Sequence, residues 1–167
     1  YQAALPLYER ALKMYIDAFG NEHSRVAETL NNLGFLYQRM GDAKKAADLY
    51  QRAVGVSTAS VGEEHPSTAA SLSNLATLHY AEGILEAALP LFERVVTLET
   101  SIYGAKHASV LGSLNNLAAA LLLNGDFKAA KTRFEQALEI QQTVDATTDS
   151  AAAITLIGVL ILSLGLA

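Results

Sequence analysis

The amino-acid sequence predicts an all-α protein, a solenoid built from pairs of helices, and three observations lead to this prediction. An aromatic motif begins at Tyr8, Tyr50, Phe92 and Phe134, and each start lies 42 residues after the one before. A second motif, of Leu and Asn, recurs with the same period. No segment shows the sustained alternation of apolar and polar residues that is typical of a strand. A fixed period of this length indicates that each repeat buries its apolar face against its neighbours.

The first helix of each repeat carries the motif of Leu and Asn. This motif begins at Leu30, Leu72 and Leu114, and a second Leu follows three residues later in each copy. Apolar residues at this spacing lie on one face of an amphipathic helix. We expect a glycine to end this helix in each repeat. The glycines at that place recur with the same period and are Gly41, Gly83 and Gly125.

The second helix follows the glycine and carries the aromatic motif. Asp42 and Asp126 come directly after two of the glycines, where an Asp side chain can accept hydrogen bonds from the first N–H groups of a helix. An alanine then recurs at Ala46, Ala88 and Ala130, and a residue this small lets two helices approach closely. Because the aromatic residues share this helix with the alanines, we expect them in the core rather than on a platform for stacking bases.

A longer linker that contains Gly and His closes each repeat. Its histidines are His23, His65 and His107, and Pro66 follows one of them at a position suited to the start of a helix. Stacked repeats would hold these histidines about two helix diameters apart, about 20 Å, whereas a Zn–N bond measures about 2 Å. We therefore expect each histidine to cap the helix that follows it, and we expect no shared metal site.

Together, the two helices resemble a tetratricopeptide repeat. That family places Leu, Gly or Ala and Tyr on its first helix, Gly at the turn, and Ala, an aromatic residue and Ala on its second. The matching residues of the first complete repeat are Leu33, Gly34, Tyr37, Gly41, Ala46, Tyr50 and Ala53. The 42-residue length and the Leu-Asn-Asn-Leu helix are similar to those of kinesin light chains. The resemblance implies a right-handed α-solenoid of antiparallel helix pairs.

The period divides the sequence into five segments of one solenoid. Residues 1–20 form the second helix of a repeat, residues 21–62, 63–104 and 105–146 form three repeats, and residues 147–167 form the first helix of a further, degenerate repeat. Since the sequence opens just inside a helix, we expect it to be part of a longer chain or of a complex.

The stretch 151–167 contains no charged residue. A helix that is apolar all round is buried on all sides or lies in lipid. Its 17 residues fall short of the roughly 20 that span a membrane, and Gly158 and Gly165 match glycines of the repeat after a shortened linker. This favours a solenoid helix covered by a further helix or a partner, with membrane contact through this stretch as the alternative. The residues expected to dock there are Leu156, Val159, Leu160 and Leu162.

Composition excludes several classes of function. The 12 Lys and Arg against 17 Asp and Glu give a net charge of −5, which argues against binding to nucleic acid. Without Cys there is no disulfide framework and no thiolate metal site, so we favour an intracellular protein of the cytoplasm or an organelle interior. No Gly-rich phosphate loop, zinc-protease motif or nucleophile elbow occurs. We expect a protein that is not an enzyme and that uses no cofactor.

Three asparagines of the first helix are the leading candidates for a binding site. Asn32, Asn74 and Asn116 recur with the repeat, and the resemblance implies that this position borders the concave groove. An amide both donates and accepts, so it can pair with an extended peptide backbone. The alternative is that these asparagines stabilise packing between helices. The full set of candidate groove residues is Asn31, Asn32, Phe35, Arg39, Asn74, Thr77, Tyr80, Asn115 and Asn116.

We therefore predict a non-catalytic scaffold that binds a segment of a partner protein of unknown identity in its concave groove. The alternative is a structural subunit of a larger, membrane-associated assembly, docked through the apolar C-terminal helix. Chaperone-binding members of the family clamp a carboxylate with Lys and Arg beside the Asn, and kinesin light chains that take acidic motifs also use basic residues. Only Arg25 and Arg39 lie on the expected first helices, which disfavours both classes of partner.

Overall fold

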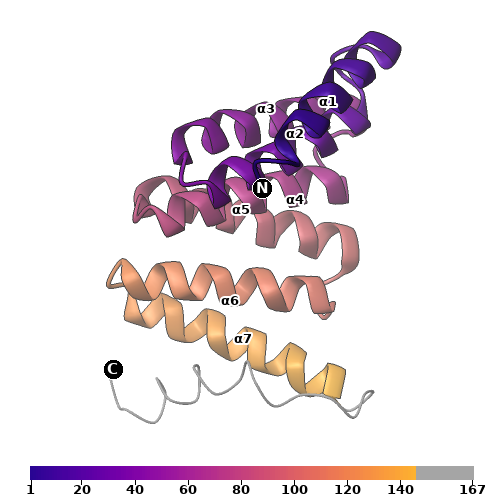
Figure 1. The fold of residues 1–167 in the computed structure, drawn as a ribbon. Coiled ribbons are helices and arrows are strands. Elements are labelled where there is room, and N and C mark those ends of the chain that lie inside the picture. The colour runs from indigo at the N-terminus through magenta and orange to yellow at the C-terminus, as the bar shows by residue number, and fades with distance from the viewer. Residues whose placement is uncertain (146–167) are drawn as a thin grey trace. The chain divides into compact units, whose positions relative to one another are not determined.

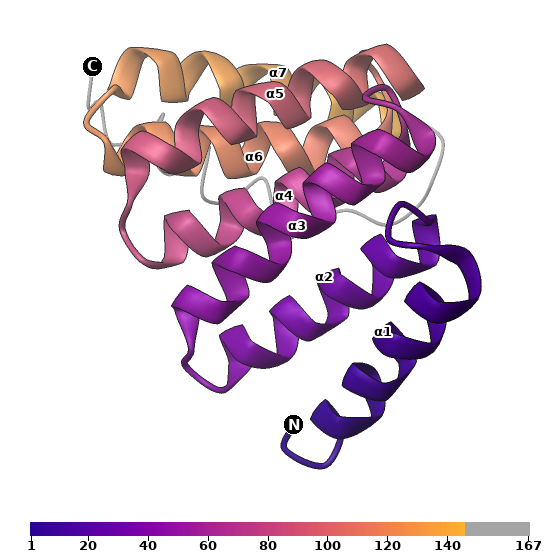
Figure 2. The same ribbon diagram turned by 90° about the horizontal axis from the view of Figure 1, so that it is seen from above.

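A computed structural model describes residues 1–145, which form α-helices joined by short loops and contain no strand (Figures 1 and 2). The helices of this part of the chain are α1 (Leu5–Phe19), α2 (Ser24–Arg39), α3 (Ala43–Val61), α4 (Pro66–Ala81), α5 (Leu85–Tyr103), α6 (Ala108–Leu123) and α7 (Phe127–Asp145). The prediction of an all-α repeat fold is therefore confirmed.

The described chain forms two compact units, one of residues Tyr1–Leu91 and one that begins at Phe92. Helix α5 crosses the boundary between them. In the first unit, α2 packs against α1, α3 and α4, and α3 also packs against α4. In the second unit, α6 and α7 pack side by side after a tight turn (Figure 1). Each unit thus contains the helix hairpin that the repeat predicts.

The core of the first unit forms where these helices meet. Val26 and Leu30 of α2 pack with Ala53 of α3, and Leu12 and Ile16 of α1 lie against them. A second cluster joins α3 and α4 through the residues Ala46, Tyr50, Leu75 and Leu78. All three alanines expected at close helix approaches are buried, with exposed fractions of 0–1%. The small residues therefore stand where the sequence places them.

Glycines with positive φ follow each of the first six helices. They are Gly20, Gly41, Gly62, Gly83, Gly104 and Gly125, with φ between 74° and 93°. A residue with a Cβ adopts this left-handed region at a cost, whereas glycine does not. The prediction that Gly41, Gly83 and Gly125 end the first helix of each repeat is confirmed, because α2, α4 and α6 end two residues before them.

The aromatic series divides into two pairs. Tyr50 and Phe92 are 2% exposed, as the prediction of a core position requires. Tyr8 and Phe134 are half-buried, so the predicted core position is confirmed for Tyr50 and Phe92 and only in part for these two. Tyr8 lies on α1, which buries no residue fully because, among the described helices, it packs against α2 alone.

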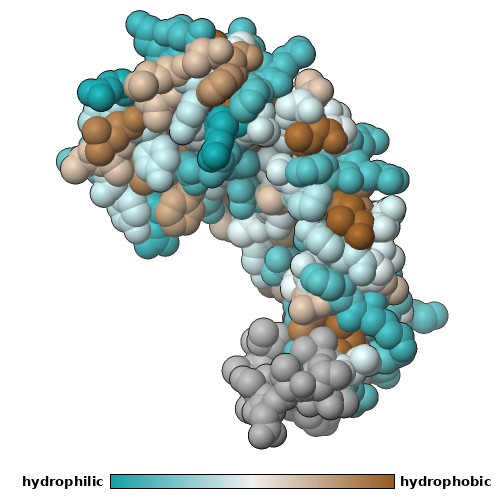
Figure 3. All heavy atoms as spheres, turned by 90° about the vertical axis from the view of Figure 1, so that its right-hand side faces the viewer, coloured by the Kyte–Doolittle hydropathy of each residue, from teal (hydrophilic) through white to brown (hydrophobic). Residues whose placement is uncertain are grey.

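The outer surface of the described chain is mixed. On the face that Figure 3 shows, hydrophobic side chains stand in separate small patches between hydrophilic ones. None of the helices within residues 1–145 combines the length and the hydropathy that crossing a membrane requires. The further helix expected at 147–167 and the docking residues Leu156, Val159, Leu160 and Leu162 lie outside the described residues.

Candidate partner-binding face

The three linker histidines cap helices, as the sequence predicts. Nδ1 of His23 accepts a hydrogen bond from the Arg25 N–H at 3.2 Å, at the start of α2. His65 and His107 accept from the N–H groups two residues on, each at 3.1 Å, at the starts of α4 and α6. Because this ring nitrogen is already an acceptor, each histidine has a local structural role. The described residues contain no cluster of three potential metal ligands.

One exposed row of side chains runs along α2 and continues on α4. Asn32, Phe35 and Arg39 are three or four residues apart on α2, so they share one face of the helix, and all three are exposed. Thr77 of α4 is also exposed, and Tyr80 is half-buried. We call the side of α2 and α4 that carries these residues the first-helix face.

Asn31 and Asn74 fix α2 against α4 beside this face. The Asn31 side-chain amide donates to the Ser71 hydroxyl at 2.8 Å, and its carbonyl accepts from the Asn74 amide at 3.4 Å. The Ser71 hydroxyl donates in turn to the Ser67 carbonyl within α4. These contacts give Asn31 and Asn74 the packing role that the sequence left open for the asparagines. Asn32, which makes none of these contacts, is exposed, whereas Asn31 and Asn74 are half-buried.

An aromatic and cationic cluster lies at one end of the first-helix face. The Tyr1 ring meets the Phe35 ring edge to face, with centroids 6.5 Å apart. The Arg39 Nε donates to the Tyr1 hydroxyl at 3.2 Å, and the guanidinium lies 5.7 Å from the Tyr1 ring centroid. Phe35 nevertheless keeps 51% of its surface exposed. The cluster therefore offers a partner the Phe35 ring, which the contact with Tyr1 orients, and the Arg39 guanidinium.

Tyr1 was missing from the candidates that the sequence singled out. Thirty-four positions separate it from Phe35, and no motif links the two. The signal that could have found it is indirect: the repeat makes residues 1–20 a helix beside α2, which puts the residues before α1 near one end of α2.

The second unit presents its own version of this face on α6. Asn116 is exposed and Asn115 is half-buried. Leu123, at the end of the same helix, is 62% exposed. This part of the chain thus offers an amide and an apolar side chain, without the aromatic and cationic cluster of the first unit.

Comparison with known proteins agrees with the repeat fold. A family model described as tetratricopeptide repeat matches residues 1–59, 26–98 and 67–143. The solved structure of BtubC (BKLC) from P. vanneervenii is similar in fold, with a TM-score of 0.80 and 23% sequence identity. The match covers 90% of this chain and 60% of that one, so the chain spans about three fifths of the length of BtubC.

A second similar structure is that of a Podosopora anserina protein, described as a kinesin light chain with nearly identical TPR-like repeats. Its TM-score is 0.77 and its identity 27%, over 94% of this chain and 73% of that one. The structure of the MamA protein is also similar in fold, with a TM-score of 0.60 and 20% identity over 85% of this chain and 66% of that one. A search of curated protein sequences found no match.

Proposed function

This chain belongs to the tetratricopeptide repeat family, and from that premise we propose that it is a non-catalytic scaffold that holds a partner protein against its first-helix face. Members of this family are generally scaffolds for protein–protein interaction. The resemblance to the kinesin-light-chain type is confirmed by the family match and by the structure from Podosopora anserina. The proposal concerns where on the chain the partner binds and what chemistry its bound segment has.

The exposed row on α2 is the observation that carries the proposal. Asn32 offers a donor and an acceptor to an extended backbone. Phe35 offers apolar surface, with 51% of its surface exposed beside the Tyr1 ring. Arg39 lies beside it, with its guanidinium against the Tyr1 ring. The three side chains together suit a segment with an extended main chain and an apolar anchor.

Preorganisation supports the same face. The hydrogen bonds of Asn31 to Ser71 and Asn74 hold α2 against α4. A surface whose helices are already fixed loses less conformational entropy when a partner binds. The asparagine pair therefore has an indirect part in binding, while Asn32 has a direct one.

Random linear peptides displayed as a library and selected on the full chain test this proposal. Affinities of the enriched peptides are then measured by fluorescence polarisation for the wild type and for the double variant Asn32→Ala, Phe35→Ala. We expect binding to weaken at least about tenfold, as it does when a central anchor of an interface is truncated. The double variant should keep its circular dichroism spectrum, since both side chains are exposed.

The matched control is the double variant Met14→Ala, Asn21→Ala. It removes an exposed apolar side chain from α1 and an exposed amide from the loop that follows, so it changes the same chemistry elsewhere. Selected peptides should bind this control as tightly as the wild type. Peptides that bind all three proteins equally would refute the proposed site.

A further inference from the structure

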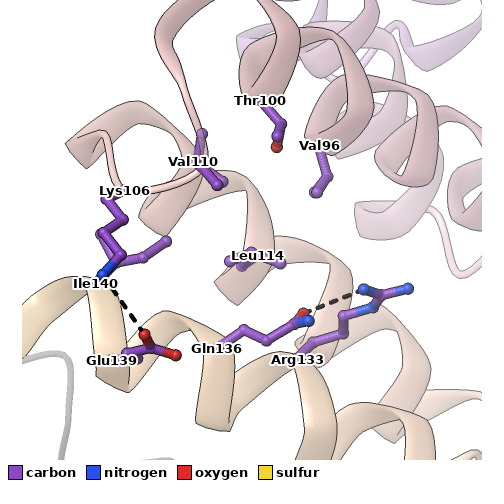
Figure 4. A pocket seen from close by; sticks show the side chains of 10 residues that line it. Val96, Thr100, Lys106, Val110, Leu114, Arg133, Gln136, Glu139 and Ile140 are labelled. Carbon is purple, nitrogen blue, oxygen red and sulfur yellow. Dashed lines mark hydrogen bonds and ion pairs between the residues drawn. The ribbon is translucent and has the colours of Figure 1, made fainter.

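The second unit contains a pocket that the proposed function does not use (Figure 4). It has a volume of about 290 Å³, just below the about 300–1,000 Å³ typical of ligand pockets. Its walls come from the second half of α5, the following loop, α6 and α7. The lining residues are Val96, Thr100, Ala105, Lys106, Val110, Leu114, Arg133, Gln136, Glu139 and Ile140.

Polar side chains stand at the two ends of this pocket, and the middle is apolar. Figure 4 shows Lys106 and Glu139 at one end, paired at 3.8 Å. Arg133 and Gln136 stand at the other end, where the guanidinium donates to the Gln136 carbonyl at 3.1 Å. Two cationic groups therefore face one carboxylate. Among the described residues the half-buried Arg133 pairs with this neutral amide and with no carboxylate.

Comparison with the first unit explains why the pocket is open. The residues 84 positions before Val96, Thr100 and Arg133 are Leu12, Ile16 and Leu49. In the first unit, these three larger apolar side chains close over the cluster of Val26 and Leu30. The second unit replaces them with a smaller apolar residue, a smaller polar residue and a cation. The middle repeat also carries Val and Thr at the first two positions, as Val54 and Thr58, so the cation Arg133 is the substitution that is particular to this copy.

The lining restricts what can enter. Val96, Val110, Leu114 and Ile140 offer no donor or acceptor, so a peptide main chain buried among them would lose its hydrogen bonds to water. An alkyl chain has no such groups to lose. Arg133 and Ile140 are seven residues apart on α7, which places them about 10 Å apart along the helix. The space suits a single chain of medium length with an anionic head beside Arg133.

We propose that this pocket binds a medium-chain alkyl carboxylate, with its tail among the apolar residues and its head on the Arg133 guanidinium. Arginine presents two parallel N–H donors that match a carboxylate. The site is separate from the first-helix side of α6. Val110 and Leu114 are buried and line the pocket, whereas Asn116, two residues beyond Leu114, is exposed on the other side of the helix.

Octanoate, octanol and butyrate, titrated into the full chain below their aggregation concentrations, test the proposal by calorimetry. We expect saturable binding of octanoate, about tenfold weaker binding of octanol, because it lacks the charged contact, and no binding of butyrate. Arg133→Gln should reduce octanoate affinity to that of octanol. Lys131→Gln, which removes an exposed charge of the same helix outside the pocket, should leave it unchanged.

A second variant tests the place of binding without changing charge. Val96→Leu with Thr100→Ile restores the side-chain types that close the first unit, so it should abolish octanoate binding while circular dichroism shows an unchanged fold. Equal octanoate affinity in this variant and the wild type, or no octanoate binding to the wild type, would overturn the proposal. The Asn32→Ala, Phe35→Ala variant should bind octanoate normally, which separates this test from that of the proposed function.

Discussion

At the scale of single residues, Gly34 decides how closely α2 and α3 approach. A Cβ at this position would lie 2.7 Å from Cε1 of Tyr50, well inside van der Waals contact. The Tyr50 ring is 2% exposed and packs with Leu75 and Leu78 of α4, so it cannot move without disturbing a second interface. The missing methyl group of Gly34 is therefore what admits the buried ring.

Replacement of Gly34 by Ala should lower the free energy of unfolding by about 1–3 kcal/mol, because overpacking forces the ring or the backbone to shift. Gly55→Ala is the matched control, since Gly55 lies within α3 and a Cβ there would meet nothing within 4 Å. That change should raise the free energy of unfolding by about 0.5–1 kcal/mol through helix propensity. Urea titrations of both variants measure the difference. Changes of the same sign would contradict this account.

Tyr50 also gives the chain a predictable response to alkaline pH. Burial raises the pKa of its phenol from 10.0 to about 12. Between these values the unfolded chain loses the proton and the folded chain keeps it, so stability falls as pH rises from 10 to about 12, by at most about 1.4 kcal/mol per pH unit. Below pH 10 this contribution is fully present.

Tyr50→Phe isolates that response from the titration of other groups. At neutral pH the variant should be less stable by about 1 kcal/mol, because the tyrosine hydroxyl no longer donates to Gln38. As the pH rises above 10, the wild type should lose more stability than the variant, and the gap should narrow or reverse. Urea unfolding at several alkaline pH values measures it. Parallel curves for the two proteins would show that the phenol does not respond to burial in this way.

At the scale of helices, the linker histidines determine where α2, α4 and α6 begin. His65 accepts from the Ser67 N–H at 3.1 Å, directly before Pro66 at the start of α4. The proline contributes no N–H of its own, and its fixed φ suits the first turn. The histidine thus accepts a hydrogen bond from one N–H group of the first turn of α4, and the proline leaves one N–H group fewer that needs an acceptor.

His65→Ala should cost about 1 kcal/mol of stability, since the start of α4 loses its side-chain acceptor. His65→Asn should keep most of it, because an Asn carbonyl is a strong N-cap acceptor. Thermal or urea unfolding of the two variants gives the comparison. An alanine variant as stable as the wild type would show that water replaces the imidazole without loss.

At the scale of the whole molecule, the sequence predicts the features that depend on neighbouring residues. It does not predict the contacts between residues that are distant in the chain. Residues near one another in the chain determine the helix start at His65, the turn at Gly41 and the buried alanines. The 42-residue period repeats each of these features. The hydrogen bond of Asn31 to Ser71 joins residues 40 positions apart, and no local sequence pattern predicts it. The half-burial of Tyr8 depends on which helices lie beside α1.

The sequence likewise predicts some features of the candidate site and misses others. The period placed Asn32, Phe35 and Arg39 on one helix, and in the structure all three are exposed on one side of α2. It treated Asn32 and Asn74 as equivalent, although the contact with Asn31 occupies Asn74 alone. The pocket beside Arg133 could have been suspected from the replaced residues, but only the packed helices show that the side chains of the described residues leave this space open.

The glycines with positive φ recur every 21 residues, from Gly20 to Gly125, which is half the period of the sequence motifs. Each interval of 21 residues contains one helix and one connection. Two intervals make one repeat and lead to the equivalent residue of the next repeat. Loss of one residue inside a helix would turn everything beyond it by about 100° and misdirect its apolar side. Loss or gain of a whole 42-residue block would bring each side chain back to an equivalent orientation. The helices therefore tolerate changes of length only in complete helix pairs, and smaller changes are confined to the linkers.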